Sequence, residues 1–116
     1  TVIEDREMIY NPNIVKVVTD KQNYALYFSR SVIPFNRDNQ LDVKYYRHIG
    51  VYAYLPECLQ QFVSLSPSIL ESIEKLEQLR ALENGIPIKM IETAYQGIGI
   101  DTPADLEITE KLISSL

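Results

Sequence analysis

The only histidine of the chain lies in a stretch whose residue types suggest a binding site. Residues 47–54 read Arg-His-Ile-Gly-Val-Tyr-Ala-Tyr and belong to a strand that we expect over residues 45–54. Successive side chains of a strand point to opposite faces, so His48, Gly50 and Tyr52 share one face and the apolar residues between them form a core face. Because Gly50 has no side chain, we expect a gap there that a ligand could fill. A core histidine hydrogen-bonded to a neighbour is the alternative, and on this strand alone it is the stronger one.

Four other polar residues have types that could bind a ligand. Arg30 ends a predicted strand just before a loop, where its guanidinium could hold a carboxylate or phosphate through two parallel hydrogen bonds. Glu77 and Gln78 lie inside a predicted helix, and both are good helix formers that also suit a solvent face. Asp101 precedes a predicted helix, where it could ligate Mg²⁺ or simply favour the helix N-terminus. Taken separately, none of these residues identifies a site.

The composition limits the classes of partner. A length of 116 residues predicts one domain with a modest core, and 46% apolar with 23% charged residues is typical of a globular protein. The formal net charge of −5 argues against nucleic acid and against an anionic membrane as partners. Cys58 is the only cysteine, so no internal disulfide is expected. No apolar run has the length of a membrane span or signal peptide, which predicts a cytoplasmic protein.

The predicted elements follow the order β-β-loop-β-α-α-β-α. We expect a linker or frayed start over residues 1–13, strands over 14–18, 24–29, 45–54 and 88–91, an irregular mobile loop over 32–45, and helices over 57–63, 69–82 and 102–114. Capping residues mark the starts of the last two helices. This order predicts an α/β protein with a mixed β-sheet and flanking helices. The hairpin strands look buried on both faces, which predicts cover from a missing half or a partner subunit.

Five ordered segments together resemble one enzyme family. They are residues 11–18 (Asn-Pro-Asn-Ile-Val-Lys-Val-Val), 25–34 (Ala-Leu-Tyr-Phe-Ser-Arg-Ser-Val-Ile-Pro), 47–54, 76–82 (Leu-Glu-Gln-Leu-Arg-Ala-Leu) and 99–106 (Gly-Ile-Asp-Thr-Pro-Ala-Asp-Leu). In this order they resemble the C-terminal half of the CMP-Kdo synthetases, the 3-deoxy-manno-octulosonate cytidylyltransferases. The resemblance implies the C-terminal part of a nucleotide-diphospho-sugar transferase-like fold, with residues 14–116 as a sugar-binding and dimerisation half. It also implies that the N-terminal CTP-binding half is absent.

The resemblance also implies an activity and roles for the polar residues. The family couples CTP and Kdo to CMP-Kdo and pyrophosphate for lipopolysaccharide synthesis. In this chain Arg30 would bind the Kdo carboxylate, and His48, Tyr52, Glu77 and Gln78 would bind its hydroxyls. Asp101 would be a carboxylate ligand of Mg²⁺, and no catalytic residue is expected in this chain.

The family further implies a homodimer, and the chain is expected to be inactive alone because it lacks the nucleotide loop. Two alternatives stay open. One is a sibling cytidylyltransferase for another acidic sugar such as a sialic acid. The other is a non-catalytic binding or assembly module in which His48 and Tyr52 are only core residues.

Overall fold

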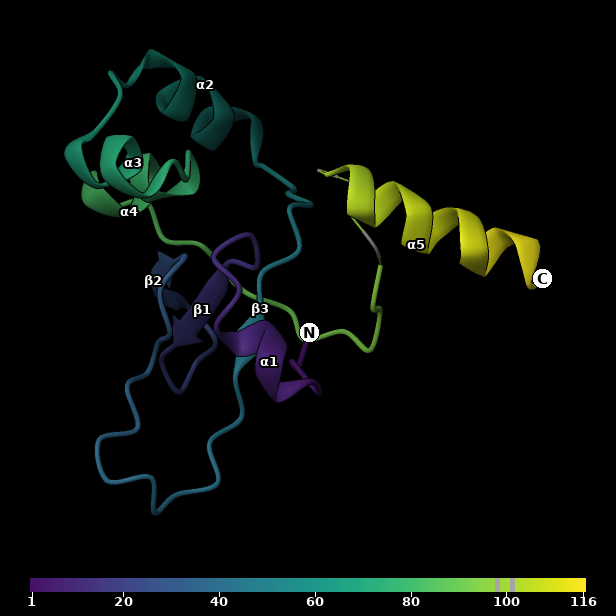
Figure 1. The fold of residues 1–116 in the computed structure, drawn as a ribbon. Coiled ribbons are helices and arrows are strands. Elements are labelled where there is room, and N and C mark those ends of the chain that lie inside the picture. Colours follow the sequence, from purple (N-terminus) through teal and green to yellow (C-terminus); the bar gives the residue numbers. More distant parts are fainter. Residues whose placement is uncertain (98, 101) are drawn as a thin grey trace.

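The computed structural model describes residues 1–97, 99–100 and 102–116 and combines a small sheet with short helices (Figure 1). The elements are α1 (Arg6–Ile9), β1 (Lys16–Thr19), β2 (Ala25–Ser29), β3 (Tyr46–Arg47), α2 (Pro56–Ser64), α3 (Ile69–Glu74), α4 (Gln78–Glu83) and α5 (Pro103–Ser114). The predicted α/β class is confirmed. The predicted helix over 57–63 is present as α2, with Pro56 in its first turn, where a missing N–H is tolerated.

The sheet has the strand order β2-β1-β3. Among the described residues, both strand pairings are antiparallel, so they include no parallel pair of the predicted mixed sheet. Val17 lies opposite Phe28 on one side and opposite Tyr46 on the other, so β1 is the central strand. The hairpin predicted from residues 14–29 is therefore confirmed, and the β3 strand adds to its free edge.

The predicted strand over 45–54 is wrong for most of its length. Only Tyr46 and Arg47 pair with β1, and the last main-chain bond to this edge runs from the His48 N–H to the Val15 carbonyl at 2.8 Å. The chain beyond leaves the sheet because β1 begins at Lys16 and provides no further paired residues. Val51, expected on a core face, is 83% exposed. Alternating apolar residues indicate a strand only where a partner strand continues beside them.

The predicted helix over 69–82 is broken into α3 and α4. Lys75 lies between them with φ 56° and ψ 46°, the left-handed conformation that ends a helix. The apolar stripe is correspondingly split. Leu79 is fully buried against the sheet, but Ile69 and Ile73 are 75% and 71% exposed.

The core lies between the hairpin and the α3–α4 pair. Val17, Phe28, Leu76 and Leu79 form one buried cluster there. The predicted strand over 88–91 reaches this region but forms only an isolated bridge, between Tyr24 and Lys89.

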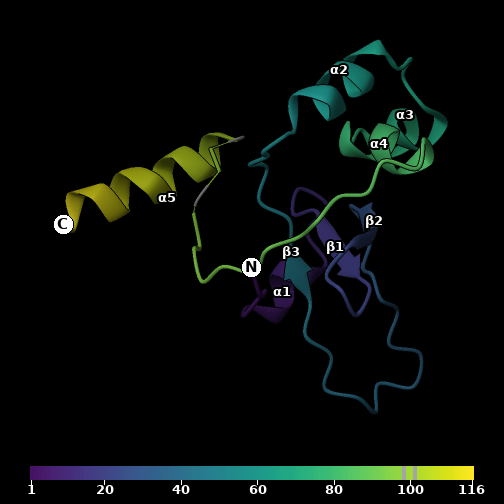
Figure 2. The same cartoon turned by 180° about the vertical axis from the view of Figure 1, so that it is seen from behind.

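The two ends of the chain behave differently. Residues 1–13 contain the α1 helix, and the ammonium group of Thr1 donates to the Arg47 carbonyl at 2.9 Å, so this segment lies against β3. The α5 helix begins as predicted, with the Thr102 hydroxyl accepting from the Asp105 N–H at 3.3 Å. It stands apart from the sheet and from α2–α4 in both views (Figures 1 and 2). The loop over 32–45 extends from the sheet on the side opposite α2–α4. Among the described residues, no helix combines the length and hydropathy that a membrane span requires.

Candidate functional site

The Arg30 guanidinium is fixed by three neutral oxygen atoms. Its Nε donates to the Glu74 carbonyl at 2.8 Å, Nη1 to the Pro12 carbonyl at 3.0 Å and Nη2 to the Lys75 carbonyl at 3.4 Å. Arginine has five N–H donors, so two remain for another acceptor. Since peptide carbonyls carry no net charge, this arrangement orients the cation without neutralising it. Such a group can bind a carboxylate or phosphate.

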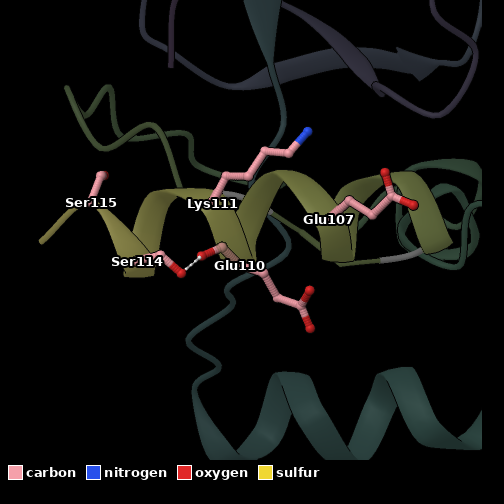
Figure 3. Close-up of a pocket in the computed structure, with 5 residues that line it drawn as sticks. All are labelled: Glu107, Glu110, Lys111, Ser114 and Ser115. Atoms are coloured by element: carbon pink, nitrogen blue, oxygen red, sulfur yellow. Dashed lines mark hydrogen bonds between the residues drawn. The ribbon is translucent and has the colours of Figure 1, made fainter.

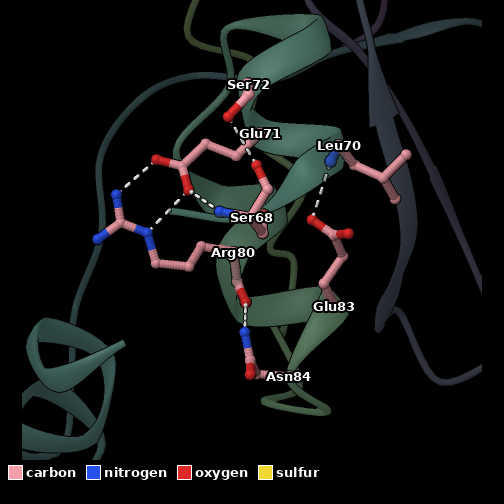
Figure 4. Close-up of polar contacts among 7 residues, drawn as sticks. All are labelled: Ser68, Leu70, Glu71, Ser72, Arg80, Glu83 and Asn84. Atoms are coloured by element: carbon pink, nitrogen blue, oxygen red, sulfur yellow. Dashed lines mark hydrogen bonds and ion pairs between the residues drawn. The ribbon is translucent and has the colours of Figure 1, made fainter. Parts of the chain in front are cut away.

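Arg80 provides the contrast. Its Nε and Nη2 donate to the two carboxylate oxygens of Glu71 at 2.8 and 2.5 Å (Figure 4). Its guanidinium also lies over the Phe62 ring, 5.3 Å from the ring centre. The hydrogen bonds from Arg80, followed by the Ser68 N–H, lower the pKa of Glu71 to about 2. Arg80 therefore already has its anionic partner and serves to hold α3, α4 and α2 together.

His48 and Tyr52 form a direct pair. The Tyr52 hydroxyl and His48 Nε2 are 2.8 Å apart, and the His48 ring meets the Phe28 ring edge-on at 5.0 Å. Burial, and secondarily the charge of the N-terminus, lowers the pKa of His48 to about 4. The imidazole is therefore neutral at neutral pH. Burial also raises the pKa of the Tyr52 hydroxyl, so this group stays protonated.

The expected gap between these two rings is not present. The chain turns at Gly50, where the Val51 N–H donates to the Ile49 carbonyl at 2.7 Å. This turn replaces the extended geometry of a strand and brings the tips of His48 and Tyr52 together. The open space lies beside Gly50 itself, since a Cβ atom added there would meet no atom within 4 Å.

Two further aromatic rings continue from the His48–Tyr52 pair toward α2. Tyr52 stacks on Tyr54 at 6.0 Å, and Tyr54 contacts Phe62 of α2 at 6.0 Å. Ring contacts therefore run from Phe28 of β2 to Phe62 of α2. The sequence analysis did not predict these contacts. The spacing of Tyr52 and Tyr54 is the only signal that could have indicated them.

The turn between α3 and α4 contacts Arg30 and leads directly to Glu77 and Gln78. The Lys75 carbonyl in this turn accepts from Arg30. Glu77, two residues later, is exposed, and its charge contributes to the raised pKa of Tyr52. Gln78 is half-buried as the first residue of α4. A hydrogen bond joins His48 to Tyr52, and Arg30 contacts the turn that precedes Glu77 and Gln78, so three separate segments supply the five predicted sugar-binding residues.

The predicted metal ligand Asp101 lies outside the described residues. Within residues 1–97, 99–100 and 102–116, no three histidine, cysteine or acidic side chains are grouped to hold a metal ion.

A shallow hollow on α5 is unrelated to this site (Figure 3). Its lining consists of side chains from one helix and its end: Glu107, Glu110, Lys111, Ser114 and Ser115. Ser114 uses its hydroxyl locally, donating to the Glu110 carbonyl at 2.7 Å. A surface built by one helix lacks the converging groups of a binding site, and we assign it no role.

Comparison with known proteins identifies the family. The sequence profile described as Cytidylyltransferase matches residues 1–92. The chain belongs to the cytidylyltransferase family. It is 54% identical to the 3-deoxy-manno-octulosonate cytidylyltransferase of Thermodesulfovibrio yellowstonii, over 97% of this chain and 46% of that protein. It is 52% identical to the enzyme of that name from Koribacter versatilis, over 95% of this chain and 42% of that protein.

A solved structure shows the same fold. This structure is described as CMP:2-keto-3-deoxy-manno-octonic acid synthetase complexed with CTP, and it matches with a TM-score of 0.87 and 42% sequence identity. The match covers 98% of this chain and 46% of the solved chain. The resemblance predicted from the five segments is therefore confirmed, and the chain spans less than half the length of the relatives it matches.

Proposed function

We propose that this chain supplies the sugar side of a cytidylyltransferase that couples CTP and Kdo to CMP-Kdo and pyrophosphate. One observation carries the proposal: the Arg30 guanidinium is oriented by neutral carbonyls and keeps two N–H donors for an anion. Kdo is a sugar acid, so its carboxylate matches a bidentate arginine. The similarity to enzymes named for this reaction supports the choice of substrate.

The remaining residues suit the hydroxyls of the sugar. Tyr52 stays protonated and His48 stays neutral, so each can donate or accept a hydrogen bond. Glu77 adds an acceptor, and Gln78 adds both a donor and an acceptor. In the proposed reaction the anomeric hydroxyl attacks the α-phosphorus of CTP and pyrophosphate leaves, so the task of these residues is to position the sugar.

Three further parts of the proposal rest on the family resemblance. A magnesium ion would neutralise charge on the phosphates, with Asp101 as the ligand that this chain contributes. A homodimer and a cytoplasmic location are proposed on the same basis. A metal titration, a sedimentation experiment and cell fractionation, respectively, measure these properties.

The binding test is a titration of the 116-residue chain with Kdo, followed by NMR chemical shifts. We expect saturable binding that Arg30→Ala weakens strongly but leaves measurable. Arg37→Ala removes an exposed arginine from the 32–45 loop and should leave binding unchanged, which makes it the matched control. Absence of binding by the wild-type chain, or equal binding by the Arg30 variant, would contradict the proposal. Stronger binding of a sialic acid than of Kdo would favour the sibling activity.

The reaction is tested in a hybrid enzyme. The segment of the Thermodesulfovibrio yellowstonii enzyme that aligns with this chain is replaced by residues 1–116, which is reasonable at 54% identity. Pyrophosphate release from CTP should then depend on Kdo and on Arg30. A hybrid that folds and binds CTP but does not respond to Kdo would contradict the proposal. If His48→Ala keeps both fold and Kdo affinity, a non-catalytic role for the His48–Tyr52 pair is supported instead.

A further inference from the structure

Lys16 interrupts a run of β-branched residues, and its side chain is fully buried. Its ammonium group donates to the carbonyls of Asn11, Ile14 and Arg30 at 3.0, 2.6 and 2.5 Å. These three bonds use all the hydrogens of the ammonium group. Lys16 thereby ties the main chain of Arg30 to the turn at residues 11–14. The same turn contains Pro12, whose carbonyl accepts from the Arg30 guanidinium.

Glu74 holds Arg30 from the opposite side. Its carboxylate accepts from the Arg30 N–H at 3.0 Å and from the Ser29 hydroxyl at 2.6 Å. Its main-chain carbonyl accepts from Arg30 Nε at 2.8 Å. One residue therefore fixes both the backbone and the side chain of Arg30. Because Glu74 is the last residue of α3, the break at Lys75 is what frees its carbonyl for this contact.

The charged groups of Lys16, Arg30 and Glu74 are an unusual choice if their role is only to stabilise the fold. A buried ammonium group is unfavourable unless it is paired, and replacing buried ionic groups by apolar ones is often neutral or stabilising. Burial lowers the pKa of Lys16, the charge of Arg30 lowers it further, and Glu74 opposes both effects. The Glu74 carboxylate bonds the Ser29 hydroxyl and the Arg30 main-chain N–H, while both cations donate to carbonyls, so the Arg30 guanidinium keeps its positive charge.

We propose that Lys16 and Glu74 are positioning residues that orient the Arg30 guanidinium toward the carboxylate of the acidic sugar. This proposal rests on the proposed function. A guanidinium binds a carboxylate through two parallel hydrogen bonds only when its two free N–H groups point toward the two carboxylate oxygens. Glu74 and Lys16 set that plane before the sugar arrives, so less ordering is needed on binding.

The test measures Kdo affinity by the same NMR titration, with Glu74→Gln as the main variant. The amide keeps the size of the side chain but presents one acceptor oxygen where the Tyr27 and Ser29 hydroxyls and the Arg30 N–H converge. We expect Kdo binding to weaken about tenfold, as for a small misplacement of a positioning group. Glu83→Gln is the matched control, since the Glu83 carboxylate accepts from the Leu70 N–H at 3.1 Å on the same helix pair and does not contact Arg30 within the described part of the chain (Figure 4). It should change the affinity by less than about twofold.

Two readouts separate positioning from general loosening of the fold. The first is the amide of Kdo, which lacks the carboxylate and whose weak binding should be unaffected by Glu74→Gln. The second is the Arg30 Nε–H signal. Kdo should shift this signal in the wild-type chain and in the Glu83 variant, and should shift it markedly less in the Glu74 variant.

A double-variant cycle tests the positioning role of Glu74 separately from the proposed sugar binding by Arg30. If Glu74 acts through Arg30, adding Glu74→Gln to Arg30→Ala should weaken binding no further. Effects that multiply, or a Glu74 variant that binds Kdo as the wild type does, would overturn the positioning role and leave the proposed function intact. An Arg30→Ala chain with wild-type affinity would overturn the proposed function itself. Lys16→Met should reproduce the Glu74→Gln loss, and if it does not fold, the Glu74 cycle carries the test.

Discussion

Protonation of His48 should destabilise the folded chain as the pH falls. The imidazole packs against Phe28, its Nε2 meets the Tyr52 hydroxyl, and burial lowers its pKa from 6.5 to about 4. Between these two pH values the unfolded chain binds a proton and the folded chain does not. The stabilisation from a neutral His48 is therefore complete above about pH 6.5 and is lost progressively as the pH falls to about 4.

The size of this effect follows from the two pKa values. Linkage gives a loss in the free energy of unfolding of about 1.4 kcal/mol at pH 5.5 and about 2.6 kcal/mol at pH 4.5. Because the ring keeps partial contact with solvent, screening should reduce the second value to about 2 kcal/mol. That is a measurable fraction of the stability of a domain of this size.

The assay compares wild type and His48→Gln in urea unfolding at pH 7.5, 5.5 and 4.5. Both chains share the same carboxylates, and His48 is the only histidine, so the change in their difference with pH isolates this one group. The gap between wild type and variant should shrink, or reverse, toward low pH. The single histidine Cε1–H NMR signal gives an independent measurement. A signal that titrates near pH 6.5, or a difference in unfolding free energy that is constant with pH, would refute the reasoning.

Three further predictions concern stability. Leu79→Ala removes a fully buried core side chain and should reduce the free energy of unfolding in urea by about 3 kcal/mol; a loss below about 1 kcal/mol would contradict the assigned core. Arg80→Met should raise the pKa of Glu71 from about 2 toward its usual 4.5, so circular dichroism should show less loss of stability between pH 4.5 and 2 than in wild type. Lys75 and Gly85 both have positive φ, 56° and 72°, a conformation that glycine adopts without strain. Lys75→Gly should therefore stabilise the chain by about 0.5–1 kcal/mol, and Gly85→Ala should destabilise it by about 1 kcal/mol. Melting temperatures that move the other way would refute the strain argument.

The sequence predicted best what short-range patterns control. Capping residues predicted the start of α5, and the helix predicted over 57–63 is present as α2, because capping and proline effects depend on residues within one turn. The β1–β2 hairpin followed from two β-branched or aromatic runs separated by a turn. The five family segments predicted the cytidylyltransferase family correctly, since five motifs in order are specific even where each alone is weak.

Predictions that needed a partner in space failed. The pattern of residues 45–54 indicated a strand. In the structure only Tyr46 and Arg47 of this segment pair with β1. Residues 69–82 have helical periodicity, but the turn at Lys75 lets two carbonyls meet Arg30, which lies far away in sequence. Neither restriction is visible in a local pattern, because each is set by a tertiary contact.

The candidate site divides in the same way. From the sequence, Arg30 was one solvated arginine among several, and His48 with Tyr52 was as easily a core pair. The sequence alone determined the side-chain types of the candidate site and the family to which the chain belongs. Only the tertiary structure decided that Arg30 is held by carbonyls and keeps its charge, while Arg80 is paired with a carboxylate. The reason is physical: a side chain's type fixes what it can bind, but the groups already bound to it depend on residues that only folding brings together.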